Sequence, residues 1–484
     1  MLRLDSEPAR LGYAMLKDTT TLGAAAIPAA PPDRGFGRFV TVRTGIPSSA
    51  SERLLRGVGW SAAGCIIGQG LSFAGSVVAA RCLGKEGFGQ FALVQTTVAA
   101  FSTLASLGLG TTALKFVSEY RTRNPQKAGI ILGLSSLVAF VAAAVFSAAL
   151  VLCAPWLAVG RASAPILTAA MRLSAPYMFF ITVNGYQMGA LSGLEAFRGI
   201  ACINMAYGLA TLVLTWSGSQ WFGLRGATLA QGLSAALLWL LYHSTLKAEC
   251  RRRNILVTYR GVGKERPALY RFSVPSTTAC LIASLAVWWS NAALARASGY
   301  AELAVFSAVN NMRLMVLFVP LIIGRVTTPL LNNMLAAGDL WGYRKTFCGS
   351  VALTGSTGIL AATVLALAGH YFLQLFGKEF TGSSALILLL LSAATLEVIA
   401  TSLYQAVFAG SSLWRQVVIN GVWTVVLVAT LQLTVSRYGV SALAFSYLAA
   451  WSSSVILYGA EAWRRLKQLE LRRSQTLERT LCNP

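Results

Sequence analysis

The feature that most constrains this chain is a recurring apolar stretch of about 20 residues. At 1.5 Å per residue, a helix of that length crosses the roughly 30 Å hydrocarbon layer of a membrane. Apolar and polar residues do not alternate with period two in these stretches, which favours helices over a membrane barrel. The predicted spans are Trp60–Ala80, Phe91–Leu114, Ala128–Leu152, Pro165–Leu191, Ile200–Ser217, Leu224–Leu246, Phe272–Ala295, Leu303–Val326, Phe347–His370, Ser384–Phe408, Val417–Val435 and Val440–Gly459. The sequence therefore predicts an all-α polytopic membrane protein with twelve transmembrane helices.

The composition agrees with this prediction. Hydrophobic residues make up 55% of the 484 residues and charged residues 12%, about half the charged share of a typical soluble protein. These values exclude an ordinary soluble domain and a disordered chain. The eight cysteines are scattered without CxxC pairs, so we expect them to pack as small apolar residues. We predict no metal site and no cofactor.

The net charge of +23 comes from 40 Lys and Arg residues against 17 Asp and Glu residues. With the N-terminus placed in the cytoplasm, 31 of the basic residues fall to cytoplasmic segments and seven to outer segments. This asymmetry follows the positive-inside rule and predicts that both termini are cytoplasmic. The excess charge is thereby explained by topology and by contact with anionic lipids, so we expect membrane lipids and no nucleic acid as partners.

The two halves of the chain resemble each other at an offset of about 215–218 residues. The matching positions are Arg81, Gly84 and Phe91 with Arg296, Gly299 and Phe306; Tyr186, Gln187, Gly193 and Arg198 with Tyr404, Gln405, Gly410 and Arg415; and Gly223 and Tyr242 with Gly439 and Tyr458. Because each repeat contains six spans, both halves have the same membrane orientation. This arrangement is typical of transporters in which two bundles move about a central cavity.

The repeat also divides the chain into segments. We predict a disordered cytoplasmic tail at 1–55, an N-terminal six-helix bundle at 56–250, a cytoplasmic basic linker at 251–271, a C-terminal six-helix bundle at 272–463 and a basic cytoplasmic tail at 464–484.

The most specific motif lies between residues 80 and 120. It consists of Arg81-Cys-Leu-Gly84-Lys-Glu-Gly-Phe88-Gly89-Gln-Phe91, then Leu107-Gly108-Leu109-Gly110, then Lys115-Phe116. A second motif is Gly189-Ala-Leu-Ser-Gly193-Leu-Glu-Ala-Phe197-Arg198. With the twelve spans, these motifs resemble the bacterial polysaccharide transporters, the O-antigen and exopolysaccharide flippases of the multidrug/oligosaccharidyl-lipid/polysaccharide exporter superfamily.

The resemblance implies a flippase without enzymatic activity. Its cargo would be an undecaprenyl-pyrophosphate-linked oligosaccharide, moved from the cytoplasmic to the outer leaflet of the bacterial inner membrane by alternating access. The pathway would make a surface polysaccharide, O-antigen or exopolysaccharide, and further partners would be a polysaccharide polymerase and export proteins. The motifs identify the family and do not identify the glycan.

Three ionisable residues lie at membrane depth, where a charge costs roughly 2.5–3.5 kcal/mol on insertion scales. Arg313 lies near the middle of the eighth span, Glu397 near the middle of the tenth, and Arg172 in the outer part of the fourth. Arg313 suits a pyrophosphate because a guanidinium makes bidentate, charge-assisted hydrogen bonds. Two interpretations stay open for Arg313 and Glu397, a mutual ion pair that fixes helix packing or a role in a cavity. Arg172 could instead extend to the outer membrane surface.

We predict that Arg313 and Arg172 bind the anionic part of the cargo and that Glu397 couples transport to an ion. No catalytic residues are expected. The candidate glycan contacts are polar residues within the spans, namely Asn184, Tyr186, Gln187, Asn310, Asn311, Tyr404 and Gln405. Each of these could also serve as a polar contact between helices.

Two other functions compete with this prediction. A drug or cation antiporter of the same superfamily needs a buried carboxylate, and the first nine spans carry none at mid-depth. A membrane-embedded polysaccharide polymerase usually needs clustered carboxylates, a metal site or a large extramembrane loop, and the sequence has no such pattern. An absent Walker A motif also argues against ATP hydrolysis by that route.

Overall fold

The structure is a computed structural model that describes residues 48–158, 164–259, 266–336, 338–380, 384–408 and 413–481. Leu55–Pro484 forms one compact unit, and the description below concerns that unit. Most of the predicted tail at 1–55 lies outside the described residues, and the first helix begins within it at Ser48.

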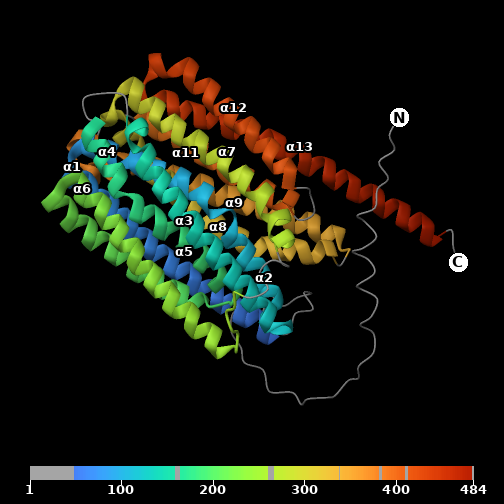
Figure 1. Ribbon diagram of the computed structural model, residues 1–484. Coiled ribbons are helices and arrows are strands. Elements are labelled where there is room, and N and C mark those ends of the chain that lie inside the picture. Colours follow the sequence, from blue (N-terminus) through green and yellow to red (C-terminus); the bar gives the residue numbers. More distant parts are fainter. Residues whose placement is uncertain are drawn as a thin grey trace, which may run out of the picture. The chain divides into compact units, whose positions relative to one another are not determined.

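The described residues form helices joined by short turns, with no strand among them. The elements are α1 (Ser48–Ser106), α2 (Leu109–Arg123), α3 (Pro125–Leu157), α4 (Ala164–Leu173), α5 (Ala175–Gly193), α6 (Phe197–Arg252), α7 (Arg266–Ser298), α8 (Tyr300–Ala336), α9 (Leu340–Leu367), α10 (Gly369–Phe376), the short 3₁₀ helix η4 (Lys378–Phe380), α11 (Ser384–Phe408), α12 (Leu413–Tyr438) and α13 (Val440–Leu481) (Figure 1).

The prediction of twelve transmembrane helices is confirmed. Ten described helical segments are long and apolar enough to cross a membrane. Two of them, in α1 and α6, are each divided by a glycine with non-helical dihedral angles, Gly84 and Gly223. Each of these segments therefore contains two spans that meet at a sharp turn, which raises the count to twelve.

Glycines in the left-handed region make four of the turns between spans. The φ angles are 69° at Gly84, 55° at Gly223, 92° at Gly299 and 53° at Gly439. A side chain is disfavoured at such angles, so glycine is the residue that allows two spans to meet without a longer loop. Gly84 and Gly223 are the sequence partners of Gly299 and Gly439, which supports the internal repeat. All four turns follow an odd-numbered span, and we call this end of the protein the Gly84 end.

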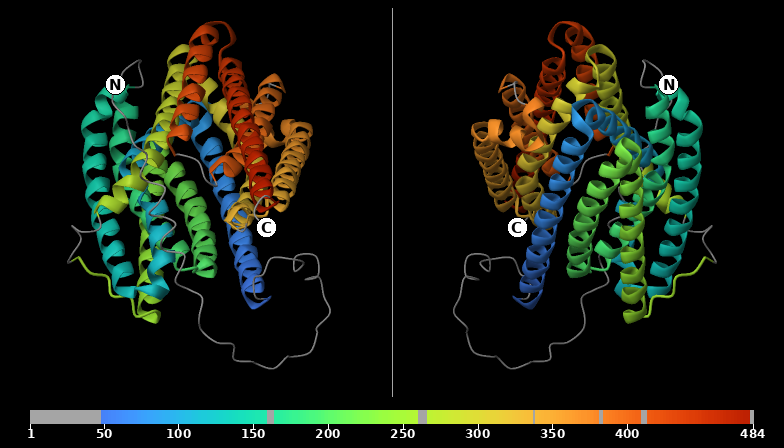
Figure 2. Two further views of the ribbon diagram at one scale, coloured as in Figure 1. Left: turned by 90° about the vertical axis from the view of Figure 1, so that its right-hand side faces the viewer. Right: turned by 90° about the vertical axis from the view of Figure 1, so that its left-hand side faces the viewer.

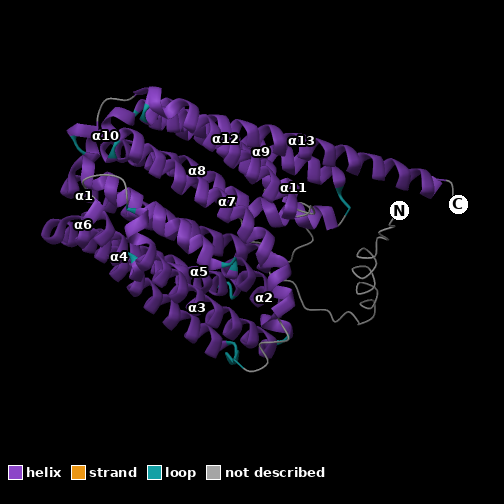
Figure 3. Cartoon of the chain, turned by 45° about the horizontal axis from the view of Figure 1, so that its top comes forward, coloured by secondary structure: helices purple, strands orange, loops and turns teal. Residues whose placement is uncertain are grey.

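Each repeat forms a bundle with its own helix contacts. In the N-terminal bundle, α5 packs against α2, α3 and α6. In the C-terminal bundle, α11 packs against α8, α9 and α13, and α12 packs against α7 and α13. Figure 3 shows these helices running side by side, with α10 and α1 at one end and α2 toward the other. The predicted two-repeat architecture is thus present.

Glycines allow three close contacts between helices. Added side chains would overlap Ala201 at Gly64 and would press on Asn204 at Gly68, so the first part of α1 lies directly against α6. On α5, a Cβ at Gly189 would overlap the backbone of Gly110 in α2. Such small-residue contacts let membrane helices gain van der Waals energy.

The chain that follows α6 is held on the N-terminal bundle. The backbone N–H of Thr258 donates to the carbonyl of Gly129 on α3, at 3.4 Å. Carbonyls of Leu256 and Thr258 lie where Cβ atoms on Gly129 and Gly133 would be. These two glycines therefore leave room for an extended segment, Ile255–Tyr259, which we call the strap.

The largest apolar core joins the two bundles. Its buried members include Phe88 and Leu93 from α1 and Leu303, Phe306 and Phe376 from the C-terminal bundle. Figure 2 shows the blue ribbon of α1 beside the yellow and red ribbons of the C-terminal bundle near the top of the view. A second core of the N-terminal bundle lies around α2, α3, α5 and α6.

Candidate functional site

Arg313 and Glu397 lie at equivalent depths in neighbouring helices. Arg313 follows the start of α8 by 13 residues, and Glu397 follows the start of α11 by the same number. At 1.5 Å per residue this is about 20 Å from the Gly84 end, well inside a 30 Å hydrocarbon layer. The two side chains are only 13% and 14% exposed.

The Arg313 guanidinium is held from three sides. It forms an ion pair and hydrogen bond with the Glu397 carboxylate through Nη1. Its Nε donates to Oδ1 of Asn310, one helical turn earlier, at 2.8 Å. The ring of Tyr447 on α13 lies 5.6 Å from its Cζ, within cation–π range. The structure therefore brings together three predicted residues, Arg313, Glu397 and Asn310.

The surroundings of this group are apolar and aromatic. Tyr447 is 4% exposed and its ring contacts those of Phe306 and Trp423, with centroids 5.8 and 6.2 Å apart. Opposite charges in such surroundings attract strongly, and each would be costly without the other. The pair is therefore neutral as a whole and keeps an arginine inside the hydrocarbon layer, where an incoming anion could compete with Glu397.

Tyr447 was not predicted from the sequence. Its position in the last span is one of many aromatic positions in the chain, and no charge or motif marks it. Only the packing of α13 against α11 places its ring near Arg313.

The polar residues predicted on the fourth span lie in the N-terminal bundle and away from Arg313. Asn184 is 2% exposed and its Nδ2 donates to the carbonyl of Ala235 on α6, at 3.0 Å. The hydroxyl of Tyr186 donates to the carbonyl of Leu132 on α3, also at 3.0 Å. Gln187 is likewise 2% exposed, and its Oε1 makes no hydrogen bond with the described residues. These contacts join helices of one bundle.

Other candidate residues have separate surroundings. The amide of Asn311 donates back to the carbonyl of Ser307 in its own helix, at 3.0 Å. Tyr404 donates to Gln416 on α12 at 3.1 Å and lies against the ring of Tyr458. Arg172 is exposed near the end of α4. The side chain of Gln405 lies outside the described residues.

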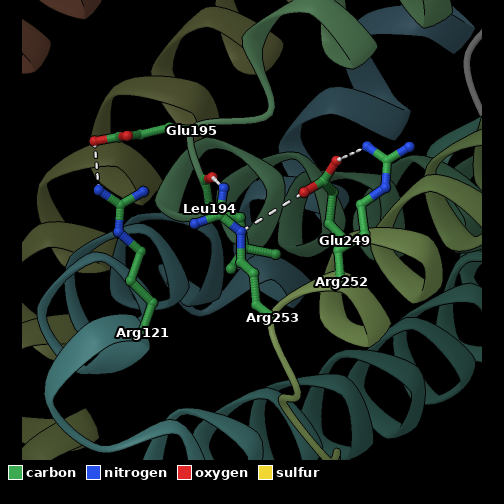
Figure 4. A network of polar contacts seen from close by, with 6 residues as sticks. All are labelled: Arg121, Leu194, Glu195, Glu249, Arg252 and Arg253. Atoms are coloured by element: carbon green, nitrogen blue, oxygen red, sulfur yellow. Dashed lines mark hydrogen bonds and ion pairs between the residues drawn. The ribbon is translucent and has the colours of Figure 1, made fainter.

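A network of charged residues lies at the opposite end of the N-terminal bundle (Figure 4). Arg121 pairs with Glu195 at 2.5 Å, and Glu249 pairs with Arg252 and Arg253 at 3.2 and 3.6 Å. Arg253 also donates to the carbonyl of Leu194 at 2.7 Å. These contacts tie α2, α5 and α6 together just before the strap begins. In the C-terminal bundle, Arg415 pairs with Glu461.

Possible metal ligands occur along the described part of the chain. There, His, Cys, Asp and Glu residues do not gather in groups of three or more that could hold an ion.

Two six-helix bundles with a parallel repeat, and the buried Arg313–Glu397 ion pair, define a polytopic membrane protein with the architecture of a transporter. The chain belongs to the polysaccharide biosynthesis protein family, whose model matches residues 54–335. This membership agrees with the family resemblance of the sequence motifs.

The chain is also similar to a polysaccharide export protein and to two solved transporter structures. The chain is 22% identical over 405 residues to the EPS I polysaccharide export inner membrane protein EpsE of Ralstonia nicotianae, covering 81% of this chain and 89% of that protein. It shares its fold with the inward-facing structure of a multidrug resistance MATE family transporter of the MOP superfamily. That match has a TM-score of 0.69 and 15% identity, and covers 85% of this chain and 99% of the other. A MOP superfamily transporter from Pyrococcus furiosus has a TM-score of 0.65 and 17% identity, with 87% and 96% covered.

Proposed function

We propose that this protein is a flippase for an undecaprenyl-pyrophosphate-linked oligosaccharide. It moves this cargo from the cytoplasmic to the outer leaflet of a bacterial inner membrane, as a step in surface polysaccharide synthesis. The family of the chain and the name of its Ralstonia relative support polysaccharide export. The predicted orientation places both termini in the cytoplasm.

The observation that carries the proposal is Arg313 inside the hydrocarbon layer. A guanidinium has five N–H donors, and in Arg313 one bonds to Asn310 and one to Glu397. A pyrophosphate offers a more negative, multidentate partner than a single carboxylate. The cargo therefore replaces Glu397 at the guanidinium, and Glu397 is then free to take up an ion.

The transport step needs no covalent chemistry. Cargo enters between the bundles from the cytoplasmic side, the bundles rock, and cargo leaves on the outer side. An inside-negative membrane potential favours outward movement of an anion by about 2.3 kcal/mol per charge per 100 mV. The isoprenoid chain stays in the lipid while the glycan passes between the bundles.

A flipping assay in proteoliposomes tests the proposal, with undecaprenyl-pyrophosphate bearing a short glycan as the probe. We expect Arg313→Ala to lower the flipping rate at least tenfold at unchanged protein level. Arg225→Ala is the matched control, because Arg225 is exposed on α6 near the Gly84 end. Flipping by Arg313→Ala at the rate of the unmodified protein would remove Arg313 from the mechanism.

A drug or cation antiporter is the second candidate, because the fold is shared with multidrug transporters. Glu397 would be its cation-binding carboxylate, yet an arginine already neutralises that carboxylate. Expression in a drug-sensitive host distinguishes the two functions. Increased drug resistance without any effect on surface glycan would favour the antiporter.

A further inference from the structure

A cluster of five phenylalanines joins the two bundles at the Gly84 end. Phe73 and Phe88 come from α1, and Phe372, Phe376 and Phe380 come from α10 and η4. Ring centroids of Phe73 lie 4.8 and 5.7 Å from those of Phe372 and Phe376. Those of Phe88 lie 5.9 and 6.1 Å from Phe376 and Phe380. We call this cluster the phenylalanine latch.

The latch holds both arms of the first helix hairpin. Phe73 precedes the turn at Gly84 and Phe88 follows it, so the C-terminal bundle contacts the first and the second span together. Phe376 is 1% exposed and lies at the centre of the cluster. Separating the bundles here would expose these rings to water. The hydrophobic effect therefore stabilises the closed arrangement.

Polar contacts on either side of the latch close the same joint. Nε of Arg81 donates to the carbonyl of Leu375 at 2.7 Å. Farther along α1, the indole Nε1 of Trp288 on α7 donates to the hydroxyl of Thr97 at 3.0 Å. Between them, the backbone of Gly89 lies so close to the carbonyl of Tyr300 that a Cβ would overlap it. All of these contacts pair a residue of the N-terminal bundle with one of the C-terminal bundle.

From this geometry we infer that the phenylalanine latch is the outer gate of the transporter. The inference rests on the proposed function and on the predicted orientation, in which the Gly84 end faces outward. Cargo that has entered from the cytoplasm cannot leave until Phe73 and Phe88 separate from Phe372, Phe376 and Phe380. The packing of Phe376 thereby sets the balance between the inward-open and outward-open states.

The first test follows the conformation directly and does not depend on cargo. In a variant with the native cysteines replaced by serine, spin labels are placed at Glu86→Cys and Tyr371→Cys, two exposed positions on either side of the joint. Double electron–electron resonance spectroscopy then measures the distance between the two spin labels. We expect Phe376→Ala to add or enlarge a population at longer distance, and Phe376→Leu to do so more weakly.

Phe347→Ala is the matched control, because Phe347 is a buried phenylalanine within the C-terminal bundle alone. A distance distribution in Phe376→Ala and Phe376→Leu that is unchanged from the parent would overturn the inference. If Phe376→Ala does not fold, the more conservative Phe376→Leu still gives the answer.

The second test locks the gate. A short bis-methanethiosulfonate reagent joins Phe88→Cys to Phe376→Cys through two disulfide bonds, and cross-linking is measured separately from flipping. We expect the cross-linked protein to lose at least nine-tenths of its flipping activity and to regain it after reduction. The control pair is Thr354→Cys with Ser402→Cys, whose parent hydroxyls lie 2.7 Å apart within one bundle.

The outcomes separate the gate from the function. Full activity of the cross-linked protein would show that the latch is a permanent contact and overturn the gate. Absence of flipping in the unmodified protein would instead contradict the proposed function, and the distance measurement would still decide whether the latch opens.

Discussion

The two bundles fill repeat-related positions between their helices with different kinds of side chain, apolar in one and charged in the other. The second and fourth spans meet in the N-terminal bundle, and their repeat partners, the eighth and tenth, meet in the C-terminal bundle. At the repeat offset of 215, Arg313 corresponds to Val98, which is 1% exposed and packs in an apolar cluster with Met178. At the offset of 218, Glu397 corresponds to Phe179, the residue after Met178.

This difference shows that apolar side chains can fill the repeat-related position in this architecture. Apolar residues pack the repeat-related position in the N-terminal bundle, and glycine backbones bring α2 and α5 together farther along. A charged pair at this position costs free energy, since both ions lose their hydration. The comparison supports the proposed role of Arg313 and Glu397 in transport, and the next prediction tests that role against one in helix association.

The largest expected effect comes from breaking the pair on one side. Arg313→Ala leaves the Glu397 carboxylate uncompensated and should lower the free energy of unfolding by roughly 3–5 kcal/mol. Replacing both residues, as Arg313→Met with Glu397→Leu, should restore stability to that of the parent or slightly above it. Denaturant unfolding in detergent measures both, and the double variant should still fail to flip cargo. A double variant as unstable as the single one would make the pair structural.

A smaller effect should follow from crowding the glycine contact of the N-terminal bundle. Gly189→Ala places a methyl group against the backbone of Gly110, and overpacking of this kind costs about 1–3 kcal/mol. Gly185→Ala, one turn earlier on the same helix, is the control because a Cβ there has open space. Thermal unfolding should separate the two variants. Equal melting temperatures would argue against a close contact between α2 and α5.

The repeat-related turns provide a comparison in which the bundles should behave alike. Gly84→Ala and Gly299→Ala each place a side chain on a backbone with positive φ, which costs roughly 1–3 kcal/mol. Neither Cβ meets a neighbouring atom, so the effect is one of backbone conformation alone. Unfolding free energies should fall by similar amounts in both variants. A loss in only one of them would show that the two turns are not equivalent.

The smallest effect is expected for the charged contacts at the end opposite Gly84. Glu195→Gln removes the pair with Arg121, and Glu461→Gln removes the pair with Arg415. One side chain of each pair is exposed to solvent, and pairs near the surface contribute about 0.2–1 kcal/mol and are screened by salt. Both variants should differ from the parent at low ionic strength and match it at 1 M salt. A loss that persists at high salt would indicate that packing rather than charge is affected.

Much of the architecture could be predicted because hydrophobic length and glycine position are local signals. Twelve spans, the repeat and the turns at Gly84, Gly223, Gly299 and Gly439 are all readable from sequence, since a twenty-residue apolar run in a membrane has few alternatives. The contact of Gly189 with α2 was not among these predictions, because the sequence does not show which helix provides the partner.

The candidate site could be predicted only in part. Charge at membrane depth marks Arg313 and Glu397, because such residues are costly. Tyr447 carries no charge that would single it out, and its contact with Arg313 depends on how α13 packs. Neutral polar residues gave a weaker signal: Asn184 and Tyr186 share the composition expected of a glycan site, yet each bonds to a backbone carbonyl of a neighbouring helix. Sequence alone does not distinguish the two uses of an amide or a hydroxyl.

The strap has a consequence for how far the bundles can separate. Because Leu256 and Thr258 lie against α3, the chain from the end of the strap at Tyr259 to the start of α7 at Arg266 is all that joins the two bundles there. Seven residue steps of 3.3–3.6 Å reach at most about 25 Å. By holding the chain on Gly129 and Gly133 of α3, the strap shortens the connection between the bundles. The length that remains limits how far the bundles can separate at that end of the protein.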